Sequence, residues 1–130
     1  MIPTGIPFHE ISIDPDVGER VVGVINHFIS KSPDKSIDIQ KVSEVVGFPG
    51  TIVKPVFYAL LGLRLLKATF LPRHRVCGKI IGSQMRSVEQ ILDKAKNEGY
   101  FCIHCADLVV DQQSIEIQII FWKPGTNVEE

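Results

Sequence analysis

Three cysteines and one histidine are spaced along the chain in two short pairs. His74 precedes Cys77 with two residues between them, and Cys102 precedes Cys105 with the same spacing. Two intervening residues let one tight turn direct both side chains of a pair toward the same tetrahedral ion. Thiolate and imidazole ligands in such pairs are typical of structural zinc sites. The sequence therefore predicts one zinc site with four ligands: His74, Cys77, Cys102 and Cys105.

A small residue follows each pair. Gly78 comes directly after Cys77, and Ala106 holds the matching place after Cys105. A turn around a metal-bound thiolate crowds backbone amides toward the sulfur, which a residue without a Cβ permits. These residues therefore favour a turn at each pair.

The interval between the two pairs is longer than in a compact zinc site, where roughly fifteen to twenty residues separate them. Residues 87–97 in this interval place apolar side chains at helical spacing, with acidic residues early and lysines late. This charge order suits the helix dipole. Gly99 then supplies a left-handed cap. We therefore expect a helix over residues 87–97, between the two metal-binding turns.

Other arrangements of the same residues stay open. Free cysteine is often buried as a small hydrophobic residue, so the three cysteines need not meet at a metal. His104 could replace His74 as the fourth ligand. Cys102 and Cys105 could form a redox pair, although the residues after Cys105 do not continue as the helix of a thioredoxin-like motif. A secreted disulfide scaffold is disfavoured, because three cysteines cannot all pair and no signal peptide is recognisable.

Length and composition favour a folded, non-membrane protein. The chain has 130 residues, 45% of them hydrophobic, which suffices for one well-buried domain. Its longest apolar run is interrupted by Lys54, Pro55, Gly62 and Arg64, and falls short of the roughly 18 to 20 residues that span a bilayer. We therefore expect a cytoplasmic, intracellular protein with no membrane partner.

Charge is unevenly distributed along the chain, whose net charge is −1. Residues 45–88 contain no Asp or Glu but carry seven Lys and Arg residues, which leaves −8 for the rest of the chain. This asymmetry predicts a basic surface for an anionic partner, unless acidic helices neutralise that surface in the folded protein. Five of the basic residues are candidates for contacts with nucleic acid phosphates: Lys54, Lys67, Arg73, Arg75 and Lys79.

Three helices are expected in the first half of the chain. Residues 1–15 are rich in proline and predict an extended arm that packs through its apolar side chains. Amphipathic patterns then predict helices at residues 16–30, 39–46 and 51–61. Asp14 and Asp38 are expected to cap the first two of them.

Strands are expected after the third helix and near the C-terminus. The apolar spacing of the third helix predicts a buried face made of Ile52, Val56, Ala59, Leu60 and Leu63. Residues 64–71 then alternate as a β-strand does, and Pro72 is expected to end that strand. Alternating isoleucines predict a second, half-buried antiparallel strand over residues 114–123.

This order of elements resembles a winged helix. The segment from Val56 to Lys67 is similar to the end of the third helix and the first wing strand of that superfamily. A winged helix followed by a zinc-binding segment also resembles the transcription initiation factor E alpha family of archaea and eukaryotes, which uses four cysteines where this chain offers His74. The resemblance implies an α+β fold with a winged-helix-like three-helix unit and a β-hairpin wing. A zinc-knuckle segment with one helix and a C-terminal antiparallel strand would follow.

Four segments follow from these patterns. They are an N-terminal extended arm at residues 1–15, a winged-helix-like unit at 16–72, a zinc-binding α+β segment at 73–124 and a polar tail at 125–130. The sequence shows no internal repeat and no linker long enough to separate independent domains.

No catalytic chemistry is predicted. Four protein ligands would close the coordination sphere of a zinc ion and leave no place for a substrate. The pair His9 and Glu10 lacks the second histidine of a zincin helix, and no glycine-rich phosphate loop occurs. We therefore expect a protein that is not an enzyme.

Two binding functions remain. The third helix offers only Thr51, Lys54 and Tyr58 outside its apolar stripe, too few polar side chains for reading base edges. Nucleic acid binding would therefore rely on phosphate contacts, in a transcriptional or regulatory role. The alternative is a protein-interaction adaptor or assembly subunit, which would use the N-terminal arm together with exposed Phe57 and Leu61 on the third helix.

Overall fold

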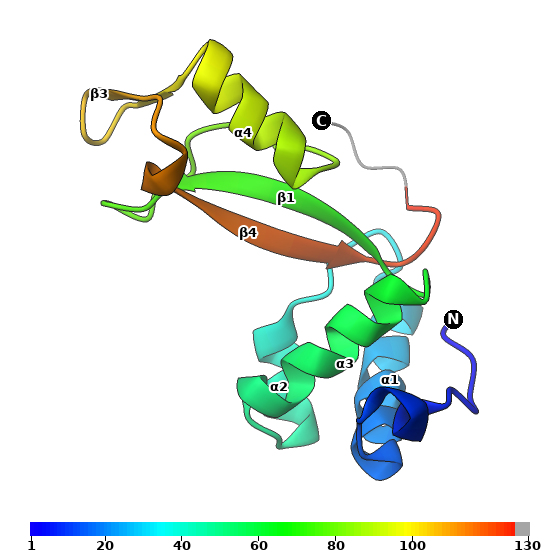
Figure 1. Ribbon diagram of the computed structural model, residues 1–130. Coiled ribbons are helices and arrows are strands. Elements are labelled where there is room, and N and C mark those ends of the chain that lie inside the picture. The colour runs from blue at the N-terminus through cyan, green and yellow to red at the C-terminus, as the bar shows by residue number, and fades with distance from the viewer. Residues whose placement is uncertain (127–130) are drawn as a thin grey trace. The chain divides into compact units, whose positions relative to one another are not determined.

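The computed structural model describes residues 1–126 and shows a mixed α+β protein, as the sequence predicted (Figure 1). Residues 127–130, most of the predicted polar tail, lie outside the described residues. The elements are η1 (Phe8–Ile11), α1 (Pro15–Lys31), α2 (Ile39–Val46), α3 (Gly50–Gly62), β1 (Lys67–His74), α4 (Val88–Asn97), β2 (Tyr100–Cys102), β3 (Asp107–Val109), η2 (Gln112–Ser114) and β4 (Ile115–Trp122).

The chain forms two compact units. The first consists of Met1–Lys67 and Phe121–Thr126, and the second contains Ala68–Ile120. The sequence placed a boundary between residues 72 and 73, whereas the contacts place it after Lys67. The contacts also assign the end of β4 to the first unit, because Ile37 and Phe121 form an antiparallel bridge there.

The helices of the first unit begin at local capping interactions. The Asp14 carboxylate accepts the Asp16 N–H at 2.9 Å at the start of α1, and the Asp38 carboxylate accepts the Gln40 N–H at 2.8 Å at the start of α2. Each bond satisfies an amide that has no partner inside its helix. Both predicted helices and both caps are therefore confirmed. Gly47, at a φ of 80°, ends α2 in the left-handed conformation.

The predicted buried face of α3 is partly wrong: Val56 and Leu60 are buried as expected, but other predicted members are not. Ile52 and Leu63 are 44% and 46% exposed, whereas Phe57 is fully buried and meets Phe121 edge-on, with ring centroids 5.0 Å apart. Nearly all residues of this helix are apolar, so helical periodicity alone did not distinguish one face from another. The observed stripe has regular i, i+3, i+4, i+7 spacing and consists of Val53, Val56, Phe57 and Leu60.

The N-terminal segment was predicted to be extended, but its residues Phe8–Ile11 form the 3-10 helix η1. Phe8 at the start of η1 is buried, and Ile2 is held by two hydrogen bonds to the Asn26 side chain, at 2.8 and 2.9 Å. The segment thus covers α1 and uses its apolar residues inside the first unit. Gly18 of α1 lies directly beneath the Phe8 ring.

Two two-stranded sheets and α4 form the second unit. β1 pairs with β4 in one antiparallel sheet, and β2 pairs with β3 in the other. α4 begins with a capping box between Ser87 and Gln90, which confirms the helix expected between the cysteine pairs. The core of the unit consists of Ile91, Ala95, Tyr100, Cys102, Val109 and Ile115.

Pro72 lies inside β1 and does not end it, contrary to prediction. The chain returns alongside β1 over residues 79–85, where Phe70 faces Met85 and the Pro72 carbonyl accepts the Ile81 N–H at 3.0 Å. This return segment bulges between the two contacts, so the ladder needs no donor at position 72. β1 therefore continues to His74. It also starts later than predicted, because Arg64, at a φ of 60°, still belongs to the turn after α3.

Membrane insertion through a helix finds no support in the part of the chain that the structure describes. None of its helices combines the length and the apolar character needed to cross a bilayer. The longest of them, α1, has 17 residues and alternates buried with exposed faces.

Gly18→Ala should destabilise the first unit, because the added Cβ would overlap the buried Phe8 ring. We expect a loss of about 1 to 3 kcal/mol, the usual cost of overpacking. Denaturant unfolding measures it. Gly23→Ala in the same helix is the matched control, since nothing lies within 4 Å of its Cβ position, and it should be neutral or stabilising. Equal effects of the two substitutions would contradict the packing of Phe8 against α1.

Candidate metal centre

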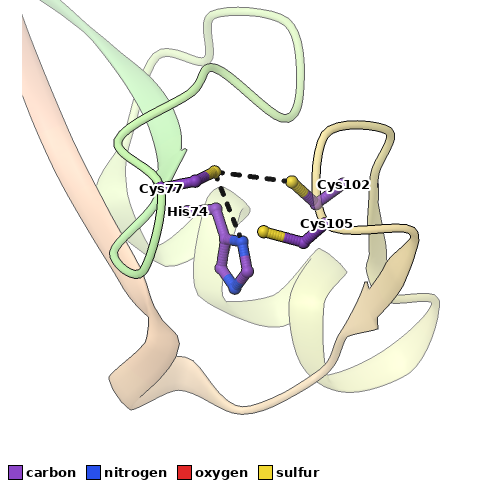
Figure 2. Close-up of side chains that lie close together, drawn as sticks. All are labelled: His74, Cys77, Cys102 and Cys105. Atoms are coloured by element: carbon purple, nitrogen blue, oxygen red, sulfur yellow. Dashed lines mark hydrogen bonds between the residues drawn. The ribbon is translucent and has the colours of Figure 1, made fainter.

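Four side chains from two loops of the second unit meet at one point (Figure 2). One ligand atom from each lies within 4.8 Å of every other. The Cys77 sulfur is 3.6 Å from the Nδ1 nitrogen of His74 and 3.6 Å from the Cys102 sulfur. His74 and Cys102 are buried, and Cys77 and Cys105 are half-buried. This quartet, the set of residues that the sequence paired, has a geometry that could bind a metal ion.

The first loop of the quartet follows β1. The Gly78 N–H donates to the His74 carbonyl at 2.6 Å, and the His74 N–H donates to the Lys79 carbonyl at 2.9 Å. Gly78 has a φ of 72°, and a Cβ built on it would meet nothing within 4 Å. The turn therefore needs glycine for its left-handed backbone and not, as the sequence suggested, for the close approach of neighbouring amides.

The second loop of the quartet repeats this design. Cys102 ends β2 and faces Asp107, the first residue of β3, so the loop between them is short. Ala106 has a φ of 51°, in the same left-handed region as Gly78. A residue with a Cβ is strained in that region by roughly 1 to 2 kcal/mol. Each loop thus places a left-handed residue directly after the second residue of its pair, Cys77 or Cys105.

The quartet continues the hydrophobic core of the second unit. Cys102 belongs to the buried cluster that α4 covers with Ile91 and Ala95, and Cys77 and Cys105 pack against that cluster. The helix between the two loops in sequence therefore supplies the apolar surface on which they rest. Ligands set against a packed surface are held in place before an ion binds.

The electrostatics of the three thiols differ. The Lys79 backbone N–H, which bonds to the Cys77 sulfur, lowers the pKa of Cys77 below its ordinary value. Burial, together with the nearby sulfurs of Cys77 and Cys102, raises the pKa of Cys105 to about 11. Three sulfurs this close cannot all be thiolates unless a cation offsets their mutual repulsion. The thiols of the quartet should therefore either keep their protons or share a bound metal cation.

The alternatives to this ligand set fit the structure less well. His104 is exposed and lies outside the quartet, so His74 supplies the imidazole. Cys102 ends a strand and Cys105 sits in the loop after it, whereas a thioredoxin-like pair begins a helix. Each cysteine is a free thiol.

Two of the predicted phosphate contacts brace the first loop. The Arg73 guanidinium donates to the Gly78 carbonyl at 2.7 Å and to the Gln118 side chain at 2.6 Å. The Arg75 guanidinium donates at 3.0 and 3.3 Å to two backbone carbonyls of η2 and β4, those of Gln113 and Ile115. Both arginines thus connect the loop to β4.

The other three predicted phosphate contacts come from both units. Lys67 donates to the Thr126 carbonyl at 2.8 Å in the first unit, and Lys54 lies 5.9 Å from the ring centre of Tyr58 on α3. Lys79 is exposed on the first loop of the second unit. The five residues are therefore divided between the two units.

The sequence reasoning missed another group of cations. Lys31, Lys35 and Lys41 line one pocket of the first unit. These lysines lie outside the acid-free residues 45–88, and Asp34 and Asp38 alternate with them along the chain. The sequence therefore contains no continuous basic segment at this position. Their spacing around a helix–turn–helix junction was the available signal.

Comparison with protein-family models, with characterised proteins and with solved structures finds no match to this chain.

Substitutions at the two left-handed residues, Gly78 and Ala106, should have opposite effects on the free energy of unfolding. Gly78→Ala should lower the free energy of unfolding by about 1 to 2 kcal/mol, and Ala106→Gly should raise it by up to about 1 kcal/mol. Chemical denaturation with the metal content held constant measures both. Gly50→Ala is the control, because Gly50 has no left-handed φ and its Cβ position is open. A destabilising Ala106→Gly would show that the second loop does not have this conformation.

Proposed function

We propose that the quartet holds one structural zinc ion. Zinc binds sulfur at about 2.3 Å and imidazole nitrogen at about 2.0 to 2.1 Å, so a tetrahedral site has sulfur–sulfur edges of about 3.8 Å and sulfur–nitrogen edges of about 3.6 Å. The corresponding separations here are 3.6 Å from Cys77 to Cys102 and 3.6 Å from Cys77 to His74. Three soft sulfurs and one imidazole suit zinc better than calcium or magnesium, which prefer oxygen ligands.

The role of such an ion would be structural. Four protein ligands fill a tetrahedral coordination sphere, so no position is left for a substrate or a reactive water. The bound ion would cancel the repulsion among the thiolates and join the two loops over the core beneath α4. We therefore propose a zinc-stabilised module without catalytic activity.

We further propose that the module is a winged helix. The order of α1, the bridging residue Ile37, α2, α3, β1 and β4 supports this, because Ile37 pairs with Phe121 at the end of β4. A residue between the first two helices that pairs with the returning strand is typical of that architecture. The quartet and α4 lie between β1 and β4 in sequence, where a winged helix has the tip of its wing. We include in this proposal the resemblance to the transcription initiation factor E alpha family, in which a zinc-binding segment also follows a winged helix.

The function that these features favour is nucleic acid binding through phosphates. An ion pair on α1 joins Arg20 and Asp16 at 3.5 Å, whereas neither Lys54 nor Lys79 forms an ion pair with a described residue. Lys54 on α3 and Lys79 on the first metal-binding loop are two such cations. Ammonium groups that no carboxylate holds are available to phosphate oxygens, with little sequence discrimination.

A specific observation also favours the second candidate function, a protein-interaction adaptor. Its expected surface is partly occupied, because Phe57 of α3 and Ile2 and Phe8 of the N-terminal segment are buried, whereas Ile11 is 44% exposed. Exposed apolar side chains also occur in the second unit, where Val76 on the first loop, Phe101 in β2 and Ile103 on the second loop are 79%, 58% and 86% exposed. A patch of this kind on a small module is typical of a protein contact. The adaptor would then bind through its loops.

Zinc analysis tests the metal. Purified protein that has not met a chelator should contain one zinc per chain, measured by mass spectrometry of the metal. Cys102→Ser should lose the ion and unfold at markedly lower temperature, because binding energy at such sites is folding energy. His104→Ala, which changes an exposed histidine outside the quartet, should keep both zinc and stability. A zinc content below about a tenth of an equivalent would refute the site.

Binding titrations at two salt concentrations test the partner. A fluorescent DNA duplex should bind at low salt and lose at least tenfold in affinity between about 50 and 200 mM, as counterion release requires. Lys54→Gln/Lys79→Gln should weaken binding severalfold. Arg73 and Arg75 are unsuitable probes, because their removal would also loosen the metal-binding loop.

An absence of binding to duplex, single-stranded DNA or RNA at low salt would refute the nucleic acid function. Self-association would then be measured by sedimentation. The adaptor predicts that Phe101→Ser/Ile103→Ser abolishes any association found, with little dependence on salt.

A further inference from the structure

The first unit has a pocket where α1 ends and α2 begins, with a volume of about 240 Å³. Lys31 is the last residue of α1, Lys35 lies in the turn between the helices, and Lys41 is in the first turn of α2. Three separate segments thus each contribute a lysine to the lining of one pocket. The pocket is lined by Phe28, Lys31, Ser32, Lys35, Ser36, Ile37, Asp38 and Lys41.

None of the three lysines has a side-chain partner in the described part of the chain. No ion pair and no hydrogen bond involves the ammonium group of Lys31, Lys35 or Lys41. Other cations differ in this respect, because Lys67 and Arg73 donate to protein oxygens at 2.8 Å and 2.6 to 2.7 Å. An unpaired ammonium group keeps all three of its N–H donors for a ligand.

The remaining lining of the pocket suits an anion with several acceptor oxygens. Asp38 is its one acid, and that carboxylate already accepts the Gln40 N–H at the start of α2. The lining therefore carries three positive charges against one negative charge. Ser32 and Ser36 add hydroxyl donors, and Phe28 and Ile37 form an apolar floor. Cations and hydroxyls arranged around an open pocket match the oxygens of a phosphate group.

We propose that this pocket is a phosphate-binding site. The phosphate could belong to a nucleic acid backbone or be a free phosphate compound, since both present the same anionic oxygens. The first source rests on the proposed nucleic acid function, and the second does not. If the ligand is nucleic acid, the pocket supplies the main contact of the first unit, in addition to Lys54 on α3.

Matched triple variants test the site in the zinc-loaded full chain. Lys31→Gln/Lys35→Gln/Lys41→Gln removes the pocket cations, and Arg64→Gln/Lys96→Gln/Lys123→Gln makes the same change in net charge with residues that do not line the pocket. At about 50 mM salt the pocket variant should bind a labelled duplex at least tenfold more weakly and lower the salt slope by about 2 to 3, whereas the control should change affinity less than about twofold. Equal effects of the two variants on the affinity would overturn the proposal.

Pyrophosphate provides the second arm, followed by NMR of the backbone amides. Saturable shifts at Ser32 and Ser36 that the pocket variant lacks and the control keeps would support the site independently of nucleic acid. Such shifts without any duplex binding would assign the pocket to free phosphate compounds and refute the proposed nucleic acid function. Duplex binding that survives in the pocket variant but is lost in Lys54→Gln/Lys79→Gln would refute the pocket and leave that function standing. Thermal unfolding and zinc content confirm that each variant is folded.

Discussion

The second unit depends on one electrostatic constraint, the meeting of three sulfurs and an imidazole within 4.8 Å. Burial, together with the neighbouring sulfurs, raises the pKa of Cys105 to about 11, and a cation would relieve the repulsion that three thiolates would create there. Apart from the core beneath α4 and the arginine hydrogen bonds of the first loop, the backbone pairing that holds the two loops is short, since β2 and β3 have three residues each. A bound ion would join loops that lie far apart in sequence and remove the repulsion at once. The short strands and the small core are consistent with that dependence.

The cations of the chain divide into those that support the fold and those that are free. Arg73 and Arg75, beside the first metal-binding loop, donate to backbone carbonyls and a glutamine amide of the same unit. Arginine suits this role because its planar guanidinium can meet acceptors on two segments at once. Within residues 1–126, the lysines around the α1–α2 junction make no such bonds. Positive charge in the sequence therefore marks an anion-binding surface only where the fold leaves the ammonium groups unpaired.

The position of the quartet links the two functional hypotheses. The two loops of the quartet and α4 are inserted between β1 and β4, so whatever the loops contact is connected directly to the strand that pairs with Ile37. A phosphate-binding first unit and an apolar loop surface could serve different partners. Zinc would then be required for the loop surface and not for the chemistry of the lysine pocket, whose residues all belong to the first unit.

The sequence by itself determined the features that depend on residues close together along the chain. The caps at Asp14 and Asp38, the helix between the cysteine pairs and the two-residue spacing within each pair were all predictable, because each rests on contacts within a few positions. The three cysteines of the quartet were also predictable, since the two-residue spacings group them in two turns. The sequence did not decide that His74 and not His104 completes it. That choice required the path of β1 past Pro72, which depends on a bulge in a segment about ten residues away.

Only the tertiary structure decided what depends on distant residues. The buried face of α3 is set by contact with Phe121, more than sixty positions later, so an almost wholly apolar helix offered no local signal for it. The hydrogen bonding of each cation also depends on distant residues. Arg73 donates to Gln118, whereas the ammonium groups of Lys31 and Lys41 have no acceptor within residues 1–126. Hydrogen bonds and packing across such separations depend on how the elements meet in space. Composition and periodicity contain little information about that arrangement, because they describe each segment separately.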